Sequence, residues 1–472
     1  MSGRSILCRT AAAILTVWLA ALAPLAQAAP PAFPDSQPGK RAAAYLDAFN
    51  TAGDETMKAY LEENLAPTSL ERMTIEQRLA TLARIRADLG RLEPARISEE
   101  TGGAVTVIGQ GSTGTWFEMG FAFEPDPPHR LLGVRIELID EPPDLDAPDT
   151  PLDEEQLSRE LDEWLDDLSA RDEFSGAVLV AAGDRPVFRR AYGLASKEYA
   201  TPNRVDTRFN LGSINKFMTR IAIEQLALAG KLSLDDTIGA LLPDYPNREA
   251  ARKVTVRHLL EMTSGIGDFF GEKYEATPKD RIRDLEDYLP LFASAPLEFE
   301  PGTSNRYSNG GYVVLGLIIE KASGKDYFEY VRENIYEPAG MTATCHLESD
   351  KPVENVASGY TRNWDDREHP DEPRRNNLYM RPCRGSSAGG GYSTVDDLLK
   401  LVLALRAGKL GAPGTARMLE GGLGIAGGAP GINAAVEVEA GGERTIVVLS
   451  NYDPPTAMNA ARKARGMLAR LQ

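Results

Sequence analysis

The spacing of apolar residues predicts a small module at the start of the chain. Residues 40–64 and 74–90 carry apolar side chains at intervals of three and four, which is typical of helices that bury one face. Residues 102–124, GGAVTVIGQGSTGTWFEMGFAFE, indicate two strands around a glycine-rich turn, and residues 129–139 indicate a third. Helices followed by a strand meander predict an α+β module.

The pattern changes after a stretch rich in proline and aspartate. Residues 140–156, DEPPDLDAPDTPLDEEQ, have the composition of an exposed linker. From residue 157 an amphipathic helix is expected, followed by a hairpin over residues 174–193 that turns at Gly183 and Asp184.

The rest of the chain reads as helices closed by strands. Helices are expected at 214–229, 255–263 and 310–323, and a fourth follows a cap at Ser393 and Thr394. Two strands within residues 431–451 and a last helix at 455–470 complete the pattern. Strands at both ends with helices between them predict a sheet whose first and last segments are neighbours.

The first residues form a separate element. Two arginines precede the apolar run AAAILTVWLAALAPLA, which ends in the small-residue pattern Ala26-Gln27-Ala28. This order is that of a secretory signal peptide, and the run is short for a retained membrane anchor. The predicted organisation is therefore a signal peptide at 1–28, an α+β module at 29–141, a linker at 142–156 and a second domain at 157–472.

The net charge limits which molecules the chain can bind, and the cysteine content limits which disulfides it can form. The chain has 472 residues and a formal net charge of −17, which opposes binding to nucleic acid or to an anionic membrane surface. After removal of the signal peptide two cysteines remain, Cys345 and Cys383. In an oxidising compartment they form either a disulfide or a pair of buried free thiols, and the sequence does not supply the separation that would decide.

Two glycine-rich motifs resemble known signatures without fitting them. GQGSTG at 109–114 matches a dinucleotide fingerprint, but the residues after it alternate like a strand, so a hairpin turn is the better interpretation. GSSAG at 385–389 matches a nucleophile elbow around Ser387, but all four histidines precede it, whereas that elbow needs a later histidine. The histidines are scattered and no metal-binding spacing occurs, so no metal and no cofactor are expected.

The motif that most directly indicates a catalytic reaction is RFNLGSINKFMT at 208–219. Ser213 and Lys216 lie three residues apart at the start of a predicted helix, so their side chains share one face. A lysine that is desolvated in a cleft has a lowered pKa and can activate a serine hydroxyl. The alternative is a capping serine beside a solvated lysine.

A second motif supplies partners for this pair. PGTSNRYSNGGY at 301–312 places Tyr307 and Asn309 on a loop ahead of an apolar helix. A tyrosine near the lysine can move a proton between nucleophile and leaving group, and an asparagine amide can hold the lysine and a substrate carbonyl.

Four motifs carry a family resemblance; in chain order they are SINK, HLLEMTSGIGDFF, PGTSNRYSNGGY and GSSAGGGYSTVDDLLKLVLAL. Residues 157–472 resemble the serine β-lactamase and penicillin-binding protein superfamily, in particular class C β-lactamase-related hydrolases and esterases. The resemblance implies a β-lactamase/transpeptidase-like α+β fold, a central antiparallel sheet flanked by helices plus an all-helical lobe. The module before it loosely resembles the NTF2-like cone fold.

The resemblance also implies site roles. Ser213 is the expected acylated nucleophile, Lys216 its base, Tyr307 the general base and acid, and Asn309 the polar group of the second motif. One departure concerns the third motif, where Ile425-Ala426-Gly427 stands in place of a lysine or histidine followed by x and glycine. The backbone N–H of Gly428 is expected to join that of Ser213 in the oxyanion hole.

These expectations indicate a periplasmic or secreted serine hydrolase. Its substrate is expected to be a small ester or amide, with cell-wall-derived molecules among the candidates. Because the third-motif cation is absent, an esterase or amidase ranks above a β-lactamase or D-alanyl carboxypeptidase. A binding or sensor protein built on a decayed hydrolase is the alternative from another class.

Overall fold

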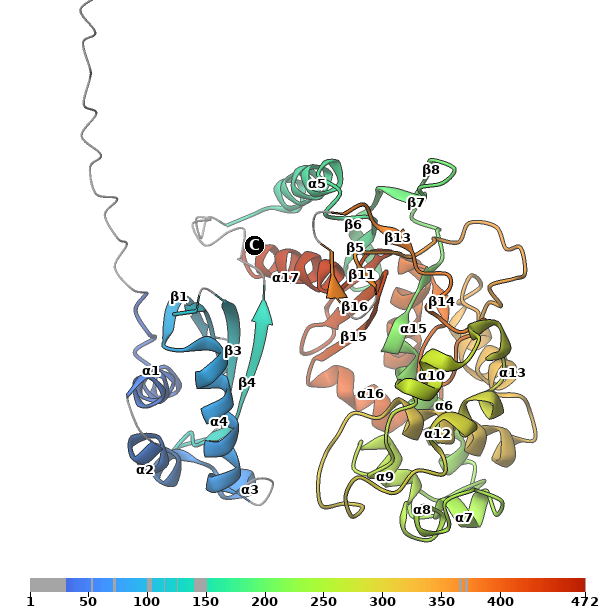
Figure 1. The fold of residues 1–472 in the computed structure, drawn as a ribbon. Coiled ribbons are helices and arrows are strands. Elements are labelled where there is room, and N and C mark those ends of the chain that lie inside the picture. The colour runs from blue at the N-terminus through green and yellow to red at the C-terminus, as the bar shows by residue number, and fades with distance from the viewer. Residues whose placement is uncertain are drawn as a thin grey trace, which may run out of the picture. The chain divides into compact units, whose positions relative to one another are not determined.

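The chain folds into two compact units, Met1–Ala147 and Pro148–Gln472 (Figure 1). The signal peptide predicted at 1–28 and residues 142–150 of the predicted linker lie outside the part of the chain that can be described. The computed structural model describes residues 31–51, 54–70, 74–99, 104–113, 115–124, 126–139, 151–364, 367–369 and 372–471.

The first unit combines helices with one antiparallel sheet. Its helices are α1 (Gln37–Asn50), α2 (Asp54–Asn64), α3 (Pro67–Leu70) and α4 (Ile75–Leu89), and its strands are β1 (Leu92–Glu99), β2 (Val105–Gly111), β3 (Trp116–Phe123) and β4 (Leu131–Ile139). The strands follow one another in sheet order; the GQG of the GQGSTG segment ends β2, and Ser112 and Thr113 lie in the turn after it. Strand β1 was not expected, because Pro94 interrupts its alternation and the pairing register shifts there.

The second unit is built on a five-stranded antiparallel sheet in the order β15-β16-β17-β5-β6. Strands β5 (Gly176–Ala182) and β6 (Arg185–Tyr192) form the expected hairpin around Gly183. Strands β15 (Leu423–Ala429), β16 (Ile432–Val438) and β17 (Arg444–Ser450) come from the other end of the chain. Since β17 pairs with β5, the first and last strands are neighbours, as predicted.

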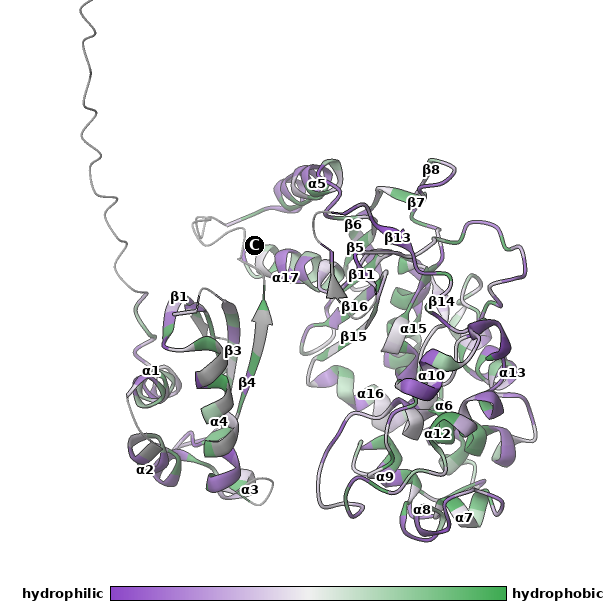
Figure 2. Cartoon of the chain, in the orientation of Figure 1, coloured by the Kyte–Doolittle hydropathy of each residue, from purple (hydrophilic) through white to green (hydrophobic). Residues whose placement is uncertain are grey.

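Alternate residues of these strands enter two separate cores. On one face, side chains such as Val178 and Val448 pack with helices α5 (Glu154–Ala170) and α17 (Thr456–Leu468). On the other face, Leu179 and Val447 pack with α6 (Asn215–Leu228), α12 (Asn309–Ser323) and α15 (Val395–Arg406). Figure 2 shows α12 as mainly hydrophobic and α5 as mainly hydrophilic, in keeping with a central and a peripheral position.

Helix α5 begins earlier than predicted, inside the stretch assigned to the linker. The Asp153 side chain accepts a hydrogen bond from the Gln156 N–H, and the Gln156 side chain accepts one from the Asp153 N–H. This reciprocal cap starts the helix at Glu154, because it satisfies N–H groups that a helix end leaves free.

Shorter elements complete the second unit. The strands are β7 (Leu194–Ser196), β8 (Thr201–Pro202), β9 (Phe209–Asn210), β10 (Tyr360–Thr361), β11 (Asn363–Trp364), β12 (Arg367–Glu368), β13 (Arg375–Asn376) and β14 (Tyr392–Ser393). The α-helices are α7 (Ile238–Leu241), α8 (Arg248–Lys253), α9 (Val256–Leu260), α10 (Glu272–Ala276), α11 (Leu289–Phe292), α13 (Tyr327–Val331), α14 (Glu337–Ala339) and α16 (Pro413–Glu420). Turns of other helix types are η1 (Gly212–Ile214), η2 (Lys279–Arg281), η3 (Leu285–Tyr288) and η4 (Arg332–Tyr336).

The two cysteines are free thiols, so the disulfide considered for Cys345 and Cys383 is not formed. The Cys345 backbone pairs with Tyr392, whereas the Cys383 thiol lies 3.6 Å from an Asp350 carboxylate oxygen. Within the described residues, no helix has the length and apolar character needed to cross a membrane. The same residues contain no group of three or more His, Cys, Asp or Glu side chains arranged to hold a metal ion.

Candidate active site

Ser213 lies where a strand turns into the central helix of the second unit. Strand β9 ends at Asn210, Gly212 adopts a φ of 50°, and the chain continues through η1 into α6. A left-handed φ is a conformation that glycine adopts without strain. Gly212 therefore makes the sharp entry that places Ser213 in the first turn, where N–H groups have no acceptor within the helix.

Lys216 is buried beside this serine. Its side chain is 7% exposed, and its Nζ lies 3.2 Å from Ser213 Oγ. The ammonium also donates to Asn309 Oδ1 at 2.7 Å and to the Ala388 carbonyl at 2.6 Å. Burial lowers the pKa of Lys216 from its ordinary value near 10.5 to about 7, and the nearby Asp268 carboxylate opposes that shift. A substantial fraction of the amine is thus neutral at neutral pH and can accept a proton.

Tyr307 contacts the same hydroxyl. Its phenol donates to Ser213 Oγ at 2.7 Å, and its ring centre lies 4.7 Å from Lys216 Nζ. About half of the side chain, 52%, remains exposed. Burial of part of the side chain raises the pKa of Tyr307, while the hydrogen bond with Ser213 lowers it. The phenol therefore stays protonated near neutral pH and is available as a proton donor.

Asn309 links the lysine to a carboxylate that was not among the predicted site residues. Its Oδ1 accepts from Lys216, and its Nδ2 donates to Asp268 Oδ2 at 2.7 Å. The Asn309 backbone N–H also donates to the same oxygen at 3.2 Å. A cation on one end of the amide and an anion on the other fix its orientation. Asn309 holds the lysine as expected, and one N–H of its amide is already committed to Asp268.

The strand that carries Gly428 packs closely against the serine turn. A methyl group added at Gly212 would lie 2.9 Å from the Gly428 nitrogen, and one added at Gly427 would lie 2.7 Å from the Ser213 nitrogen. The backbones of η1 and β15 can approach this closely because both positions lack a side chain. Gly428 and Ser213 thus lie on adjoining backbone segments, which is the arrangement that a two-donor oxyanion hole requires.

The GSSAG segment supports the site through its backbone. Ser387 is fully buried, and its hydroxyl donates to the Tyr312 carbonyl, so it is not an exposed nucleophile. The Ser387 carbonyl accepts from Thr219 of α6, and the next carbonyl, Ala388, accepts from Lys216. The glycine-rich loop therefore approaches a neighbouring element, as predicted.

A half-buried histidine, His346, lies beside Gly391 at the end of this loop. Asn215 Nδ2 donates to His346 Nε2 at 2.7 Å, and Asn215 Oδ1 accepts from the Gly391 N–H at 3.1 Å. Burial and the nearby Arg384 charge lower the pKa of His346 to about 3, so the ring is neutral. Asn215, the residue between the nucleophile turn and Lys216, thus ties α6 to the loop.

The third-motif position holds no cation. Ile425 is half-buried on β15 and packs against the main core. The other lysine-x-glycine match, Lys409 to Gly411, follows α15, and Gln225 in the last turn of α6 donates to the Leu410 carbonyl. Because α6 rises about 1.5 Å per residue, this end lies roughly 18 Å along the helix from Ser213.

Sequence patterns missed two parts of the site. Asp268 lies within the HLLEMTSGIGDFF motif, but a single carboxylate in a loop has no spacing that identifies a partner. The Ala388 carbonyl is a backbone group, and any residue could supply it. A carboxylate within a glycine-containing loop, ahead of a tyrosine–asparagine motif, is the one available signal for Asp268.

The sequence of the second unit is similar to that of known proteins over most of its length. The model of the Beta-lactamase family matches residues 161–470. Penicillin-binding protein 4* of Bacillus subtilis (strain 168) is 30% identical over 52% of this chain and 55% of its own length. Esterase EstB of Burkholderia gladioli is 33% identical over 56% of this chain and 74% of its own length. The chain thus spans little more than half of the first of these relatives.

Solved structures agree on the fold. A penicillin binding protein from Bacillus halodurans, 31% identical, superposes with a TM-score of 0.57 over 64% of this chain and 98% of its own. D-amino acid amidase from Ochrobactrum anthropi SV3 gives a TM-score of 0.56 at 22% identity, over 66% of this chain and 98% of its own. These similarities confirm the predicted β-lactamase/transpeptidase-like fold.

Proposed function

The chain belongs to the Beta-lactamase family of serine hydrolases, and from this premise we propose that it hydrolyses small esters or amides through an acyl-enzyme on Ser213. The observation that carries the proposal is the Ser213 hydroxyl, which lies 3.2 Å from the Lys216 amine and 2.7 Å from the Tyr307 phenol. A nucleophile within reach of a base and a proton donor is the minimum set for covalent acyl transfer.

Each proton has a defined path in the proposed reaction. The neutral Lys216 amine takes the proton of Ser213 Oγ as the oxygen attacks the substrate carbonyl. Tyr307 gives its proton to the leaving alkoxide or amine, and the Lys216 ammonium restores the phenol proton. In deacylation, water replaces the leaving group and the same groups act in the opposite order. The backbone N–H groups of Ser213 and Gly428 stabilise the negative oxygen in both steps.

The third-motif position favours neutral substrates at that end of the site. A charged hydrogen bond to a substrate carboxylate contributes about 1.5–3 kcal/mol. Ile425 offers no such bond, so penicillins and D-alanyl peptides lose that contribution. We therefore rank short-chain esters and amides above them. Hydrolysis of a penicillin as fast as a short-chain ester would reverse this order.

A covalent probe tests the proposal directly. A fluorophosphonate should label the wild-type chain, and the Ser213→Ala variant should remain unlabelled. Mass spectrometry after incubation with activated esters should find the acyl group on the peptide that contains Ser213. Absence of labelling and of ester hydrolysis in a correctly folded chain would instead favour the alternative, a binding or sensor protein on a decayed hydrolase.

Two further expectations extend the proposal beyond the second unit. We propose export to the periplasm or the medium, since residues 1–28 have the pattern of a signal peptide. Fractionation of cells that express the full chain, with N-terminal sequencing for a start at residue 29, tests it. We also propose an NTF2-like role for the helices and sheet of the first unit, as a docking or covering module.

A further inference from the structure

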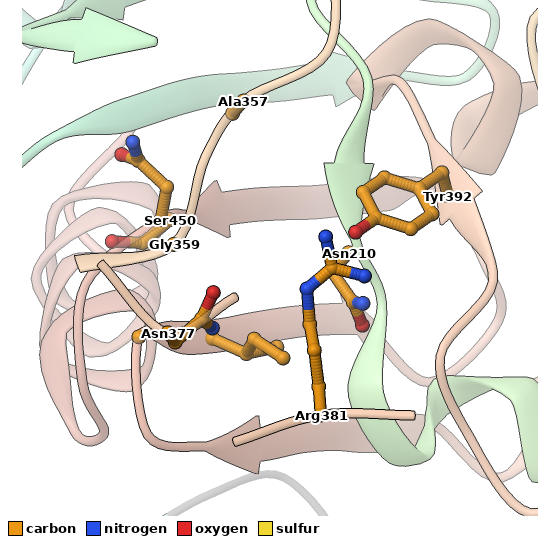
Figure 3. Close-up of a pocket in the computed structure, with 10 residues that line it drawn as sticks. Asn210, Ala357, Gly359, Asn377, Arg381, Tyr392 and Ser450 are labelled. Carbon is orange, nitrogen blue, oxygen red and sulfur yellow. The ribbon is translucent and has the colours of Figure 1, made fainter. Parts of the chain in front are cut away.

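A polar pocket lies next to the proposed nucleophile in the second unit. Its wall includes Asn210, whose Oδ1 accepts from the Gly212 N–H at 2.9 Å, one residue before Ser213. Tyr392 pairs with Asn210 across the short β9–β14 ladder and also lines the pocket. In Figure 3 the Arg381 side chain extends from its loop toward Tyr392 and Asn210. The pocket therefore shares a wall with the turn that carries the serine.

Arg381 enters this pocket without an ionic partner. Residues 373–395 contain four arginines and no aspartate or glutamate, although the chain as a whole is acidic. Among the described residues, the Arg381 guanidinium has no ion pair and no hydrogen bond, and the Tyr392 ring lies at 6.0 Å. The other three have carboxylate partners: Arg374 with Asp453 at 3.1 Å, Arg375 with Glu372 at 3.7 Å and Arg384 with Asp284 at 3.8 Å.

The loop that carries Arg381 is held in place. The Met380 carbonyl accepts from the Tyr274 hydroxyl at 3.2 Å, and the Met380 N–H donates to the Asn377 carbonyl at 3.0 Å. Asn377 itself is buried and donates through Nδ2 to the Pro430 carbonyl at 2.8 Å. A fixed backbone reduces the conformational entropy that the loop would lose when Arg381 binds a ligand.

A buried acceptor on the pocket wall also lacks a partner. Asn451 is 3% exposed and donates through Nδ2 to the carbonyls of Leu194 and Ser358, whereas its Oδ1 is buried without a hydrogen bond. A buried acceptor without a partner is costly, so a donor is expected here, such as a water that can donate to Oδ1 and also to a ligand oxygen. The hollow measures about 220 Å³ with its open side included, so the pocket is small and reachable from solvent.

The position of the pocket indicates which part of a substrate reaches it. Gly428 lies near the end of β15, with Ile425 three residues before it on the strand and the pocket residue Gly431 three residues after it, in the turn that leads to β16. Tyr307 is the proposed donor to the leaving group, and no residue of its loop lines the pocket. With the leaving group on the Tyr307 side, as the proposed function has it, the acyl chain is the part of the substrate left to extend toward Asn210 and Gly431.

We infer that this pocket, with Arg381 as its cation, is a subsite for a carboxylate at the far end of the acyl chain, so that the preferred substrates are half-esters or half-amides of dicarboxylic acids. A guanidinium pairs with a carboxylate through two parallel N–H donors, which gives both affinity and orientation. The inference rests on the proposed function, since it names the substrate class of the same site.

A substrate series tests this subsite. For the wild-type protein, p-nitrophenyl monoesters of succinate, glutarate and adipate are compared with the butyrate, valerate and hexanoate esters. The ratio of kcat/KM between charged and neutral esters should favour at least one dicarboxylate. In Arg381→Met that ratio should fall by about 10- to 100-fold, the range for a lost charged hydrogen bond. Arg375→Met is the matched control, because Arg375 lies six residues away and does not line the pocket; it should leave the ratio unchanged.

A second measurement uses the wild-type protein, so it tests the subsite even if the Arg381→Met variant does not fold. Free glutarate should slow fluorophosphonate labelling of Ser213 at concentrations where butyrate does not. Labelling and neutral-ester hydrolysis without any preference for the charged esters, or an unchanged ratio in folded Arg381→Met, would overturn the subsite alone. Absence of labelling and of all ester hydrolysis would overturn the proposed function instead.

Discussion

At the scale of single residues, the site depends on one amine kept out of water. Lys216 is buried under a carbonyl, an amide oxygen and two aromatic rings, and desolvation is the largest cause of its lowered pKa. The same burial is unfavourable for folding. The unfolded chain binds the lysine proton up to its ordinary pKa near 10.5, and the folded chain releases it near 7, so the contribution of Lys216 to stability rises with pH between these values.

The pH dependence of hydrolysis should report this amine. Since the neutral form is the proposed base, kcat/KM for a neutral ester should rise about tenfold per unit below pH 7 and level off above it. Lys216→Arg is the informative variant, because a guanidinium keeps the charge and cannot lose its proton. It should abolish acylation at every pH, as measured by fluorophosphonate labelling. A profile that is flat from pH 5 to 8 would contradict the assignment of Lys216 as base.

Asp268 should set the pH at which the acidic limb of the kcat/KM profile lies. Its carboxylate raises the pKa of Lys216 and also accepts hydrogen bonds from the side-chain amide and the backbone N–H of Asn309. In Asp268→Asn the charge is lost, so the acidic limb of kcat/KM should move to lower pH. The maximal kcat should fall as well, because the amide loses its ionic partner.

A purely structural role for Asp268 would lower activity without moving the limb. The control is Asp167→Asn on α5, where the aspartate pairs with Arg171 on the opposite face of the sheet. This variant should reproduce the wild-type profile. A limb that moves to higher pH in Asp268→Asn would contradict the electrostatic role.

At the scale of elements, the contact between η1 and β15 decides whether two N–H groups can face one oxygen. A methyl group at Gly427 would lie 2.0 Å from the Leu211 carbonyl oxygen and 2.7 Å from the Ser213 nitrogen. Neither atom belongs to a flexible side chain, so the strand must move away. Such overpacking costs about 1–3 kcal/mol, and loss of an oxyanion donor reduces kcat by about 100- to 1000-fold.

The expected outcome for Gly427→Ala is therefore a large loss of kcat with a modest fall in the thermal midpoint. Gly424→Ala offers a control on the same strand, since a methyl group there meets nothing within 4 Å. The Gly424→Ala variant should retain the wild-type kcat and the wild-type thermal midpoint. Equal kcat in the two variants would show that the close approach of β15 is dispensable for catalysis.

Elements with strong local signals could be predicted, and those defined by distant contacts could not. Helix α12 has an apolar run, a Ser308 cap that accepts from Gly311 N–H, and Gly324 at a φ of 72° beyond its end. Strand β15 is rich in glycine and alanine, and its place came from the family resemblance. The meeting of Ser213 with Tyr307 spans 94 residues, which no local period can encode. The roles of these residues remain predictions until they are tested by substitution.

At the scale of the whole molecule, the two units have separate hydrophobic cores. The core of the first unit contains buried residues from 42 to 131, whereas the two cores of the second unit contain residues from 152 to 468. A core that draws on one unit alone can form without the other. The second unit also holds every residue of the candidate active site and of the carboxylate subsite.

A fragment of residues 148–472 should therefore fold and hydrolyse esters by itself. We expect its kcat/KM for a small soluble ester to lie within about twofold of that of the full chain, because the second-unit cores contain no residue of the first unit. Thermal unfolding of the fragment should show one transition, and the full chain should show a further transition that a fragment of residues 29–147 reproduces alone. A fragment that folds, takes up the fluorophosphonate on Ser213 and yet turns over esters far more slowly would assign the first unit a part in the chemistry. The decisive comparison then uses bulky and small esters side by side: a docking module would alter only the bulky ones, since a small ester needs no contact outside the site.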